Sequence, residues 1–284
     1  FVMRWLRAVL PLALLCAGMV HAHDPSAWGG MFRSRDDGAT WLPVDAGLFI
    51  GGAMAVAISP SDPNLLLYAT DTRLLRSRNG GRDWTQEGAD RLIGPTLSVA
   101  FDPDGKGAVA SSSGGVFRTD GGAQWTASNV PTGAAPARSI VPGGASGRFY
   151  LAGPRGLYAS SDHGRAFTRL GDTLPESAAS ALVVIPGQLD TIVAVIEGAL
   201  WIGADGGARW RQSRAGLPEG GIDTIAAVDR LPNSLWAFGA DQLYTSEDGG
   251  AGWRPVGKPV PERGTSVHAM AVSHDSRAIV LTTH

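Results

Sequence analysis

The chain has 284 residues, of which 44% are hydrophobic, and its formal net charge at pH 7 is −2. A mildly acidic chain without a cluster of Lys or Arg argues against a nucleic-acid partner. The single cysteine excludes an intramolecular disulfide, and the 39 glycines indicate a packed domain that is rich in turns.

The N-terminal segment has the features of a secretory signal peptide. Two arginines precede an apolar run over 8–20, and Val20-His21-Ala22 fits the small-residue rule for cleavage. The apolar run of 13 residues is too short to span a bilayer. We therefore expect a signal peptide over 1–22 and one exported domain over 23–284, which is periplasmic or secreted and does not span the membrane.

Beyond this segment, the pattern S-x-D-x-G-x-x-W occurs in six copies, some of them altered. The acidic or amide positions of these copies are Asp36, Asn79, Asp120, Asp162, Asp205 and Asp248. The aromatic residues that close them are Trp41, Trp84, Trp125, Phe167, Trp210 and Trp253. The steps between successive acidic positions are 43, 41, 42, 43 and 43 residues. A period this steady predicts a repeat architecture.

The residue types of this pattern predict a turn between two strands. An Asp or Asn followed by Gly favours a hairpin, and its side chain can accept hydrogen bonds from backbone N–H groups further along. Glycine allows the positive φ that such a turn needs, and the closing aromatic residue buries a large apolar surface. We interpret the six Asp or Asn residues as structural. A catalytic site occurs once in a protein, whereas a residue that stabilises a turn recurs in every repeat.

Between these turns, each repeat contains the pattern of four short strands. Apolar stretches over 54–58 and 65–68 predict the first two strands of one repeat, and the third and fourth flank the motif turn. The later first strands are expected over 97–101, 136–140, 180–184, 223–227 and 268–272. Four strands in about 42 residues are typical of one blade of a β-propeller.

The two ends of the chain supply complementary halves of one blade. The repeats begin with a third and fourth strand over 29–44 and end with a first and second strand over 267–282. We therefore expect an all-β, six-bladed β-propeller of four-stranded antiparallel blades, in which N- and C-terminal strands share one blade. Closure would remove the exposed edges of an open array. A fragment of a larger ring is the second reading.

Strand alternation places the loops on two faces. The first-to-second turns and the motif turns share one face, which we call the motif-turn face. The second-to-third links and the connections between blades share the other, which we call the long-loop face. Long, variable loops around a channel mouth are where ligands and partners usually bind, so we expect function on the long-loop face.

Polar residues interrupt the apolar column of first strands near this face. The column contains Met54, Leu97, Pro136 and Ser180, and in the last two blades Asp223 and His268. Arg138 lies two residues further along its strand and hence on the same side. The candidate binding residues are these three, Arg138, Asp223 and His268, together with the loop residues Arg73, Arg155 and Glu197. The alternative is that they are solvated strand ends.

The six motif turns closely resemble the Asp-box (BNR) repeat. The chain as a whole is similar to exported photosystem II assembly-factor-like proteins, whose propellers also carry Leu-Pro turns between blades, as in Leu174-Pro175 and Leu217-Pro218. The resemblance implies a non-enzymatic scaffold that binds a membrane or envelope protein. Those proteins usually have seven blades and six are counted here, so only the broad class is carried over.

The Asp-box resemblance also implies an alternative function, in which the protein is a glycoside hydrolase or a carbohydrate-binding propeller. A glycosidase needs two carboxylates about 5–9 Å apart, which Asp223 with Glu197 or Glu219 could supply. Sialidases of this repeat type are a more distant likeness, and Phe32-Arg33-Ser34 departs from their Arg-Ile-Pro signature. No catalytic triad, phosphate loop or metal-ligand spacing is present, so we expect no catalytic residue, metal or cofactor.

Overall fold

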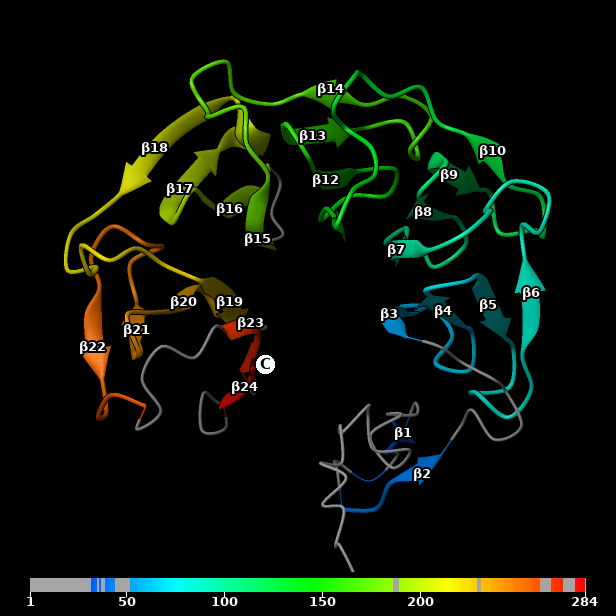
Figure 1. Cartoon of the computed structure of the whole chain (residues 1–284), viewed down its shortest axis with the longest axis horizontal. Coiled ribbons are helices and arrows are strands. Elements are labelled where there is room, and N and C mark those ends of the chain that lie inside the picture. Colours follow the sequence, from blue (N-terminus) through cyan, green and yellow to red (C-terminus); the bar gives the residue numbers. More distant parts are fainter. Residues whose placement is uncertain are drawn as a thin grey trace, which may run out of the picture.

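The computed structural model describes residues 32–34, 36, 39–43, 52–185, 189–228, 231–260, 267–272 and 279–283. These residues form five four-stranded antiparallel sheets and two two-stranded sheets, arranged as blades around a central channel (Figure 1). The all-β prediction is confirmed. The predicted signal peptide over 1–22 lies outside the described residues. Within them, no helix reaches the length and apolar character that a membrane crossing requires.

Each complete blade has four strands that pair in chain order. The first blade contains β3 (Ala53–Ile58), β4 (Leu66–Thr70), β5 (Leu74–Ser77) and β6 (Thr85–Glu87). The second contains β7 (Thr96–Phe101), β8 (Ala108–Ser112), β9 (Gly115–Thr119) and β10 (Thr126–Ala127). The third contains β11 (Ser139–Pro142), β12 (Phe149–Gly153), β13 (Gly156–Ser160) and β14 (Thr168–Arg169). The fourth contains β15 (Ala179–Ile185), β16 (Thr191–Ile196), β17 (Ala199–Ala204) and β18 (Arg209–Ser213). The fifth contains β19 (Thr224–Val228), β20 (Leu231–Gly239), β21 (Gln242–Ser246) and β22 (Arg254–Val256).

The first strands lie around the channel and the fourth strands at the periphery (Figure 1). The middle strands are the most buried, as in β16, where Ile192 to Ile196 are all inaccessible to solvent. Runs of β-branched residues suit a strand that is covered on both faces, as in this blade, which lies between the third and the fifth (Figure 1). The core therefore consists of layers between blades, not of one central cluster.

One such layer joins the first two blades. Leu67 and Leu74 of the first blade pack with Val99, Phe101 and Trp125 of the second. Each fully buried side chain of this size contributes about 1.5–3 kcal/mol relative to an exposed one. The aromatic residue that closes a motif turn thus packs against the preceding blade.

The motif turns fall into two groups. In four of them the side chain at the acidic position accepts hydrogen bonds from backbone N–H groups; these are Asp36, Asn79, Asp162 and Asp248. In the other two, Asp120 and Asp205 accept hydrogen bonds from the side chains of Arg118 and Arg209. These two copies lack the serine that stands two residues before the acidic position in the others. Asp205 instead begins a short 3-10 turn, Asp205–Gly207.

The two terminal strand pairs do not share a blade in this structure. Strands β1 (Phe32–Arg33) and β2 (Leu42–Pro43) form one two-stranded sheet, and β23 (Val267–Val272) and β24 (Ile279–Thr283) form another. Within the described residues no strand ladder joins them. Each pair is held by a different neighbour: β23 contacts β19, whereas Arg33 of β1 donates to carbonyl oxygens near β4 and β5. They flank one opening in the ring (Figure 1).

Candidate functional site

A β-bulge interrupts the first strand of the blades at its long-loop end. In β3, Ala53 and Ala55 pair with Thr70 and Ala69, and the residue between them is skipped. The same skip occurs in β7, β15 and β23. The residues left outside the ladder are Met54, Leu97, Ser180 and His268.

The remaining two blades have the same irregularity. Phe238 pairs with Thr224, yet its carbonyl oxygen also accepts the N–H of Asp223 at 2.8 Å. Ala152 pairs with Ser139 and accepts the N–H of Arg138 at 3.1 Å. The bulge positions around the channel are therefore Met54, Leu97, Arg138, Ser180, Asp223 and His268.

This alignment corrects one sequence-based expectation. Arg138 itself occupies the column in its blade, whereas Pro136 was expected there and Arg138 two residues further along. The N–H of Ala137, the residue before this bulge, bonds Oγ of Ser111 in the second blade at 2.7 Å, and the ladder with β12 starts at Ser139. The predicted strand over 136–140 is accordingly wrong at its start.

Bulges turn a side chain away from the sheet and are frequent next to functional sites. The side chains of Arg138, Ser180 and Asp223 are exposed, as is that of Met54. The column has an apolar arc, Met54 and Leu97, on two neighbouring blades, and its other four positions carry residues with polar side chains. We call these six positions the bulge ring.

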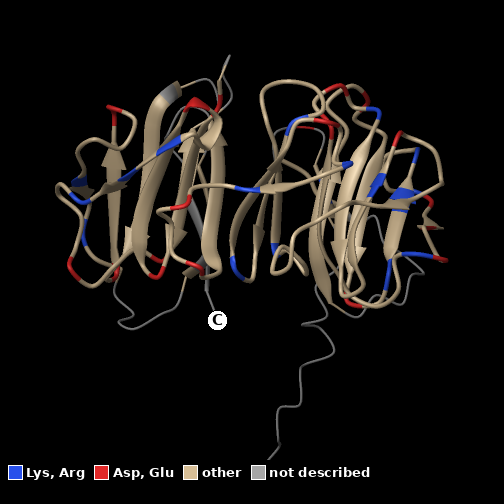
Figure 2. Cartoon of the chain, turned by 90° about the horizontal axis from the view of Figure 1, so that it is seen from above, with Lys and Arg blue, Asp and Glu red and all other residues tan. Residues whose placement is uncertain are grey.

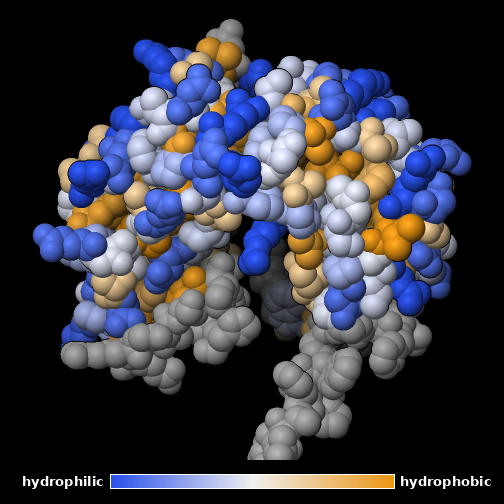
Figure 3. Space-filling view, turned by 45° about the horizontal axis from the view of Figure 1, so that its top comes forward, coloured by the Kyte–Doolittle hydropathy of each residue, from blue (hydrophilic) through white to orange (hydrophobic). Residues whose placement is uncertain are grey.

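The channel next to the bulge ring is lined by small and apolar side chains of the first strands. A hollow of about 550 Å³ lies along β11, β15, β19 and β23, with Ser139, Leu182, Ile225 and Met270 among its lining residues. The space-filling view shows this hollow at the centre of the ring (Figure 3). An occupant of the channel would therefore meet most of its polar partners at the mouth.

The three loop candidates do not belong to the bulge ring. Arg73, Arg155 and Glu197 lie in the links between second and third strands, which are further from the channel than the first strands. Arg155 forms an ion pair with Glu176 at 2.6 Å, and Glu197 accepts a hydrogen bond from Ser177. Glu197 also has φ +52, which is uncommon for a residue with a side chain.

A second hollow, of about 470 Å³, lies on the same face beside the fourth blade. Glu197, Glu219 and Arg214 contribute charged groups to its lining, and Leu200 and Ile222 contribute apolar ones. Asp223 follows Ile222 directly, so this groove adjoins the bulge ring. Charged residues of both signs are interspersed along the two faces of the protein (Figure 2).

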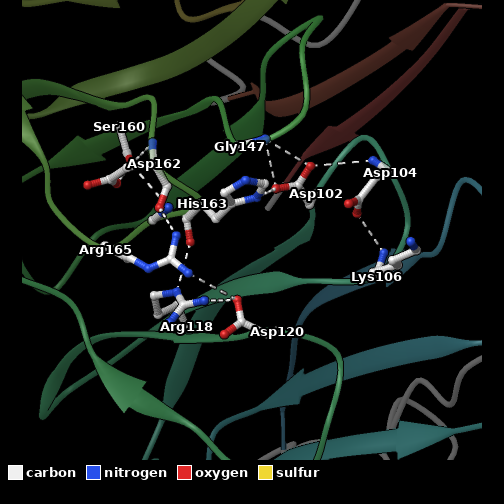
Figure 4. A network of polar contacts seen from close by, with 11 residues as sticks. Asp102, Asp104, Lys106, Arg118, Asp120, Gly147, Ser160, Asp162, His163 and Arg165 are labelled. Carbon is white, nitrogen blue, oxygen red and sulfur yellow. Dashed lines mark hydrogen bonds and ion pairs between the residues drawn. The ribbon is translucent and has the colours of Figure 1, made fainter.

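Sequence reasoning missed a network that joins the second and third blades on the motif-turn face (Figure 4). The buried carboxylate of Asp102 accepts the N–H of Gly147 and lies 2.9 Å from Nδ1 of His163. Arg118 donates to the carbonyl oxygen of His163 at 3.0 Å and pairs with Asp120. Apart from the pair of Arg118 with Asp120, each of these contacts joins residues more than 40 positions apart in the sequence. No local sequence pattern could therefore indicate this network.

Other blades are joined by comparable buried polar contacts. Arg76 and Glu87 form an ion pair at 2.7 Å that is almost fully buried, and Glu87 also accepts the indole N–H of Trp125 at 2.9 Å. Asp190, also fully buried, accepts the hydroxyl of Tyr150. Burial, together with this hydrogen bond to Asp190, raises the pKa of the Tyr150 hydroxyl. We interpret these groups as structural, because they tie neighbouring blades together. Within the described part of the chain, no three His, Cys, Asp or Glu side chains gather as a metal site would require.

Solved structures with the same arrangement of blades were found by comparison. YCF48 bound to a D1 peptide is similar with a TM-score of 0.67 and 19% identity, over 89% of this chain and 83% of that one. The fold is a β-propeller.

Two further propellers show the range of proteins with this fold. The GH74 xyloglucanase from Xanthomonas campestris has a TM-score of 0.62 and 23% identity over 80% of this chain. This chain covers only 42% of that enzyme's length. PorZ, a surface component of the type-IX secretion system of Porphyromonas gingivalis, has a TM-score of 0.59 and 15% identity, over 84% of this chain and 31% of that one. No family model and no curated protein matches the chain.

Proposed function

We propose that this protein is an exported, non-enzymatic propeller that binds a segment of another protein at its channel mouth. The observation that carries this proposal is the bulge ring, in which the first strand of each of the five complete blades, and β23 likewise, places one residue outside the strand ladder at one end of the channel. Two apolar and four polar positions suit a peptide, which offers apolar side chains and hydrogen-bonding groups together.

The likeness to YCF48 supports a peptide as the occupant. That structure contains a D1 peptide, and the two chains overlap over most of their lengths. The GH74 enzymes, by contrast, are more than twice as long as the part that this chain covers.

The proposed partner is a membrane or envelope protein. The predicted signal peptide over 1–22 would deliver the domain to the periplasm or outside the cell, with cleavage near Ala22. The likeness to PorZ, a bacterial surface component, is consistent with that location. We propose in addition that the motif turns are Asp boxes and that the ring has six blades.

Affinity capture from the native envelope extract tests the proposal. The wild-type protein is compared with Arg138→Glu, which reverses a charge in the bulge ring without altering a ladder residue. Arg82→Glu is the matched control, because Arg82 is exposed and lies in a motif turn on the opposite face. We expect one envelope protein to be retained by the wild type and the control and lost by Arg138→Glu. Equal retention by all three would contradict the proposed site.

A carbohydrate-active propeller is the second candidate. The likeness to GH74 enzymes and the groove lined by Glu197 and Glu219 favour it. Against it, exposed large aromatic residues in the described part of the chain are confined to Phe32 and Trp41 in the terminal pair, whereas sugar sites use such rings for stacking. Hydrolysis of xyloglucan or aryl glycosides that is abolished by Glu197→Gln would establish this candidate.

A further inference from the structure

The connections that follow the third and the fourth blade take the same course. Each contains Leu-Pro-Glu, which ends at Glu176 in one and at Glu219 in the other. In each, the N–H of the leucine bonds the carbonyl oxygen three residues earlier, at 3.0 Å after the third blade and at 3.1 Å after the fourth. The two glutamates therefore occupy equivalent places on the long-loop face.

In the third blade this glutamate lies between two arginines. Arg155 forms an ion pair with one carboxylate oxygen of Glu176 at 2.6 Å, and Arg169 approaches the other to 4.0 Å. Arg155 directly precedes the third strand β13, and Arg169 belongs to the fourth strand β14. The charge of Glu176 is thus neutralised by side chains of its own blade.

The fourth blade lacks both arginines. Gly198 directly precedes β17, as Arg155 precedes β13. Gln212 pairs with the tryptophan of β17, as Arg169 pairs with the tyrosine of β13. Among the described residues, Glu219 consequently makes no ion pair or hydrogen bond.

The groove of about 470 Å³ beside the fourth blade lies where these two side chains are missing. Gly198, Gln212 and Glu219 are all among its lining residues. Leu200 and Ile222, which are buried, add an apolar wall. An arginine packs its aliphatic stem on apolar surface and donates charge-assisted hydrogen bonds to carboxylates from its guanidinium. The groove therefore offers the contacts that an arginine side chain requires.

The other charged residues of the groove leave Glu219 without a counter-charge. Glu197 adds a second carboxylate, which accepts a hydrogen bond from Ser177. The guanidinium of Arg214 donates to the side-chain oxygen of Gln212 and not to a carboxylate. Two carboxylates against one guanidinium favour a cationic occupant.

We propose that this groove binds an arginine side chain of the partner segment, with Glu219 as its counter-charge. The occupant takes the place that Arg155 and Arg169 fill in the third blade. The inference deepens the proposed function and rests on it in one respect, because the segment bound at the bulge ring would supply the arginine. Asp223 of the bulge ring directly follows Ile222 of the groove, so one extended segment spans both.

A probe that does not depend on the partner tests the groove. The probe is N-acetyl-arginine amide, and N-acetyl-citrulline amide is its neutral control of nearly the same shape. Each is titrated into the ¹⁵N-labelled full chain, and the amide signals of Gly198 and Gly221, which line the groove, are followed by NMR. We expect both signals to shift with the arginine compound and the citrulline compound to bind about threefold to fivefold more weakly, because it lacks the charge.

Two variants change the groove in different ways. Glu219→Gln removes the counter-charge, and Gln212→Arg supplies from within the blade the cation that Arg169 provides in the third one. Both should weaken binding of the arginine compound by about threefold to fivefold. Glu176→Gln is the matched control and should leave binding unchanged, because Glu176 is already paired with Arg155.

Equal binding of the two compounds, unchanged affinity in Glu219→Gln, or the absence of shifts at Gly198 and Gly221 would overturn the proposal. A variant that fails to fold is recognised by the collapse of its NMR spectrum, and the other variant then decides. Capture with Arg138→Glu tests binding at the bulge ring separately. Failure of the groove and failure of the proposed function are therefore distinguishable.

Discussion

The carboxylate of Asp102 lies 2.9 Å from Nδ1 of His163, a residue that is 61 positions further along the chain and belongs to the next blade. Both oxygens of the same carboxylate accept the N–H of Gly147, at 3.0 and 2.9 Å. Asp102 is almost completely buried, whereas about half of the His163 side chain is exposed. One carboxylate therefore joins two loops of the third blade to the second blade.

Asp102→Ala should destabilise the fold more than His163→Ala does. The aspartate variant leaves the buried N–H of Gly147 without an acceptor, at a cost of about 1–3 kcal/mol. The histidine variant removes only a half-exposed partner. The free energy of unfolding from urea titrations measures both, and an equal or smaller loss for Asp102→Ala would show that solvent replaces the carboxylate.

Breaking the ion pair between Arg76 and Glu87 should be costly, whereas replacing both partners should cost less. Glu87→Ala leaves a buried guanidinium without its counter-charge and the indole N–H of Trp125 without an acceptor, and we expect a loss of about 3–5 kcal/mol. The double variant Arg76→Met with Glu87→Leu fills the same space with apolar atoms and leaves only the indole N–H without its partner, so it should be clearly more stable than Glu87→Ala. A double variant as unstable as Glu87→Ala would contradict this account.

Gly216→Ala and Gly257→Ala separate backbone strain from steric overlap. Both glycines have positive φ, +81 and +71, so alanine is strained at either position, by about 1–2 kcal/mol. At Gly216 the added Cβ would also overlap the carbonyl oxygen of Trp253, whereas at Gly257 it has open space. Gly216→Ala should therefore lower the melting temperature clearly more, and equal shifts would mean that the connection at Gly216 moves without cost.

Asp248→Asn should reduce the acid sensitivity of the fold. The N–H of Gly252 and the hydroxyl of Ser246 hold the pKa of the Asp248 carboxyl below its usual value. The stabilisation is therefore complete above the unfolded-state pKa, about 3.9, and is lost as the pH falls through the lower folded-state value.

Asparagine can replace the hydrogen bonds of this turn without titrating, since Asn79 accepts the equivalent N–H groups of Arg82 and Asp83. Urea midpoints measured from pH 7 to strongly acidic pH should fall less steeply for Asp248→Asn than for the wild type. Parallel curves for the two proteins would show that this carboxylate does not contribute to acid unfolding.

The repeat made much of the fold predictable. The period and the turn chemistry of the motif are local features, so the four-stranded antiparallel blades followed from residues close together in the chain. The bulge at Arg138 did not, because a bulge is defined by pairing between two strands, and Pro136 misled the alignment of β11. The network around Asp102 was also missed, since its main contacts join residues 45 and 61 apart.

The terminal strands show a different limit of sequence reasoning. Counting strands predicts that β1–β2 and β23–β24 belong to one blade, yet the two pairs are held by separate neighbours in this structure. Arg33, Arg76 and Arg118 each directly precede a serine or threonine, an equivalence to which the sequence analysis assigned no role. Its meaning became apparent only from the carbonyl groups that these arginines reach in the next blade.

The backbone of the bulge ring accepts side chains of very different chemistry. A residue skipped by the strand ladder contributes little to sheet pairing, so the blades accept methionine, arginine, serine or aspartate at this position with the same backbone. Under the binding function proposed above, recognition would be altered one blade at a time while the strands that present the side chains keep their pairing. New partners could then be acquired by substitution at the bulge alone, without insertion of new loops.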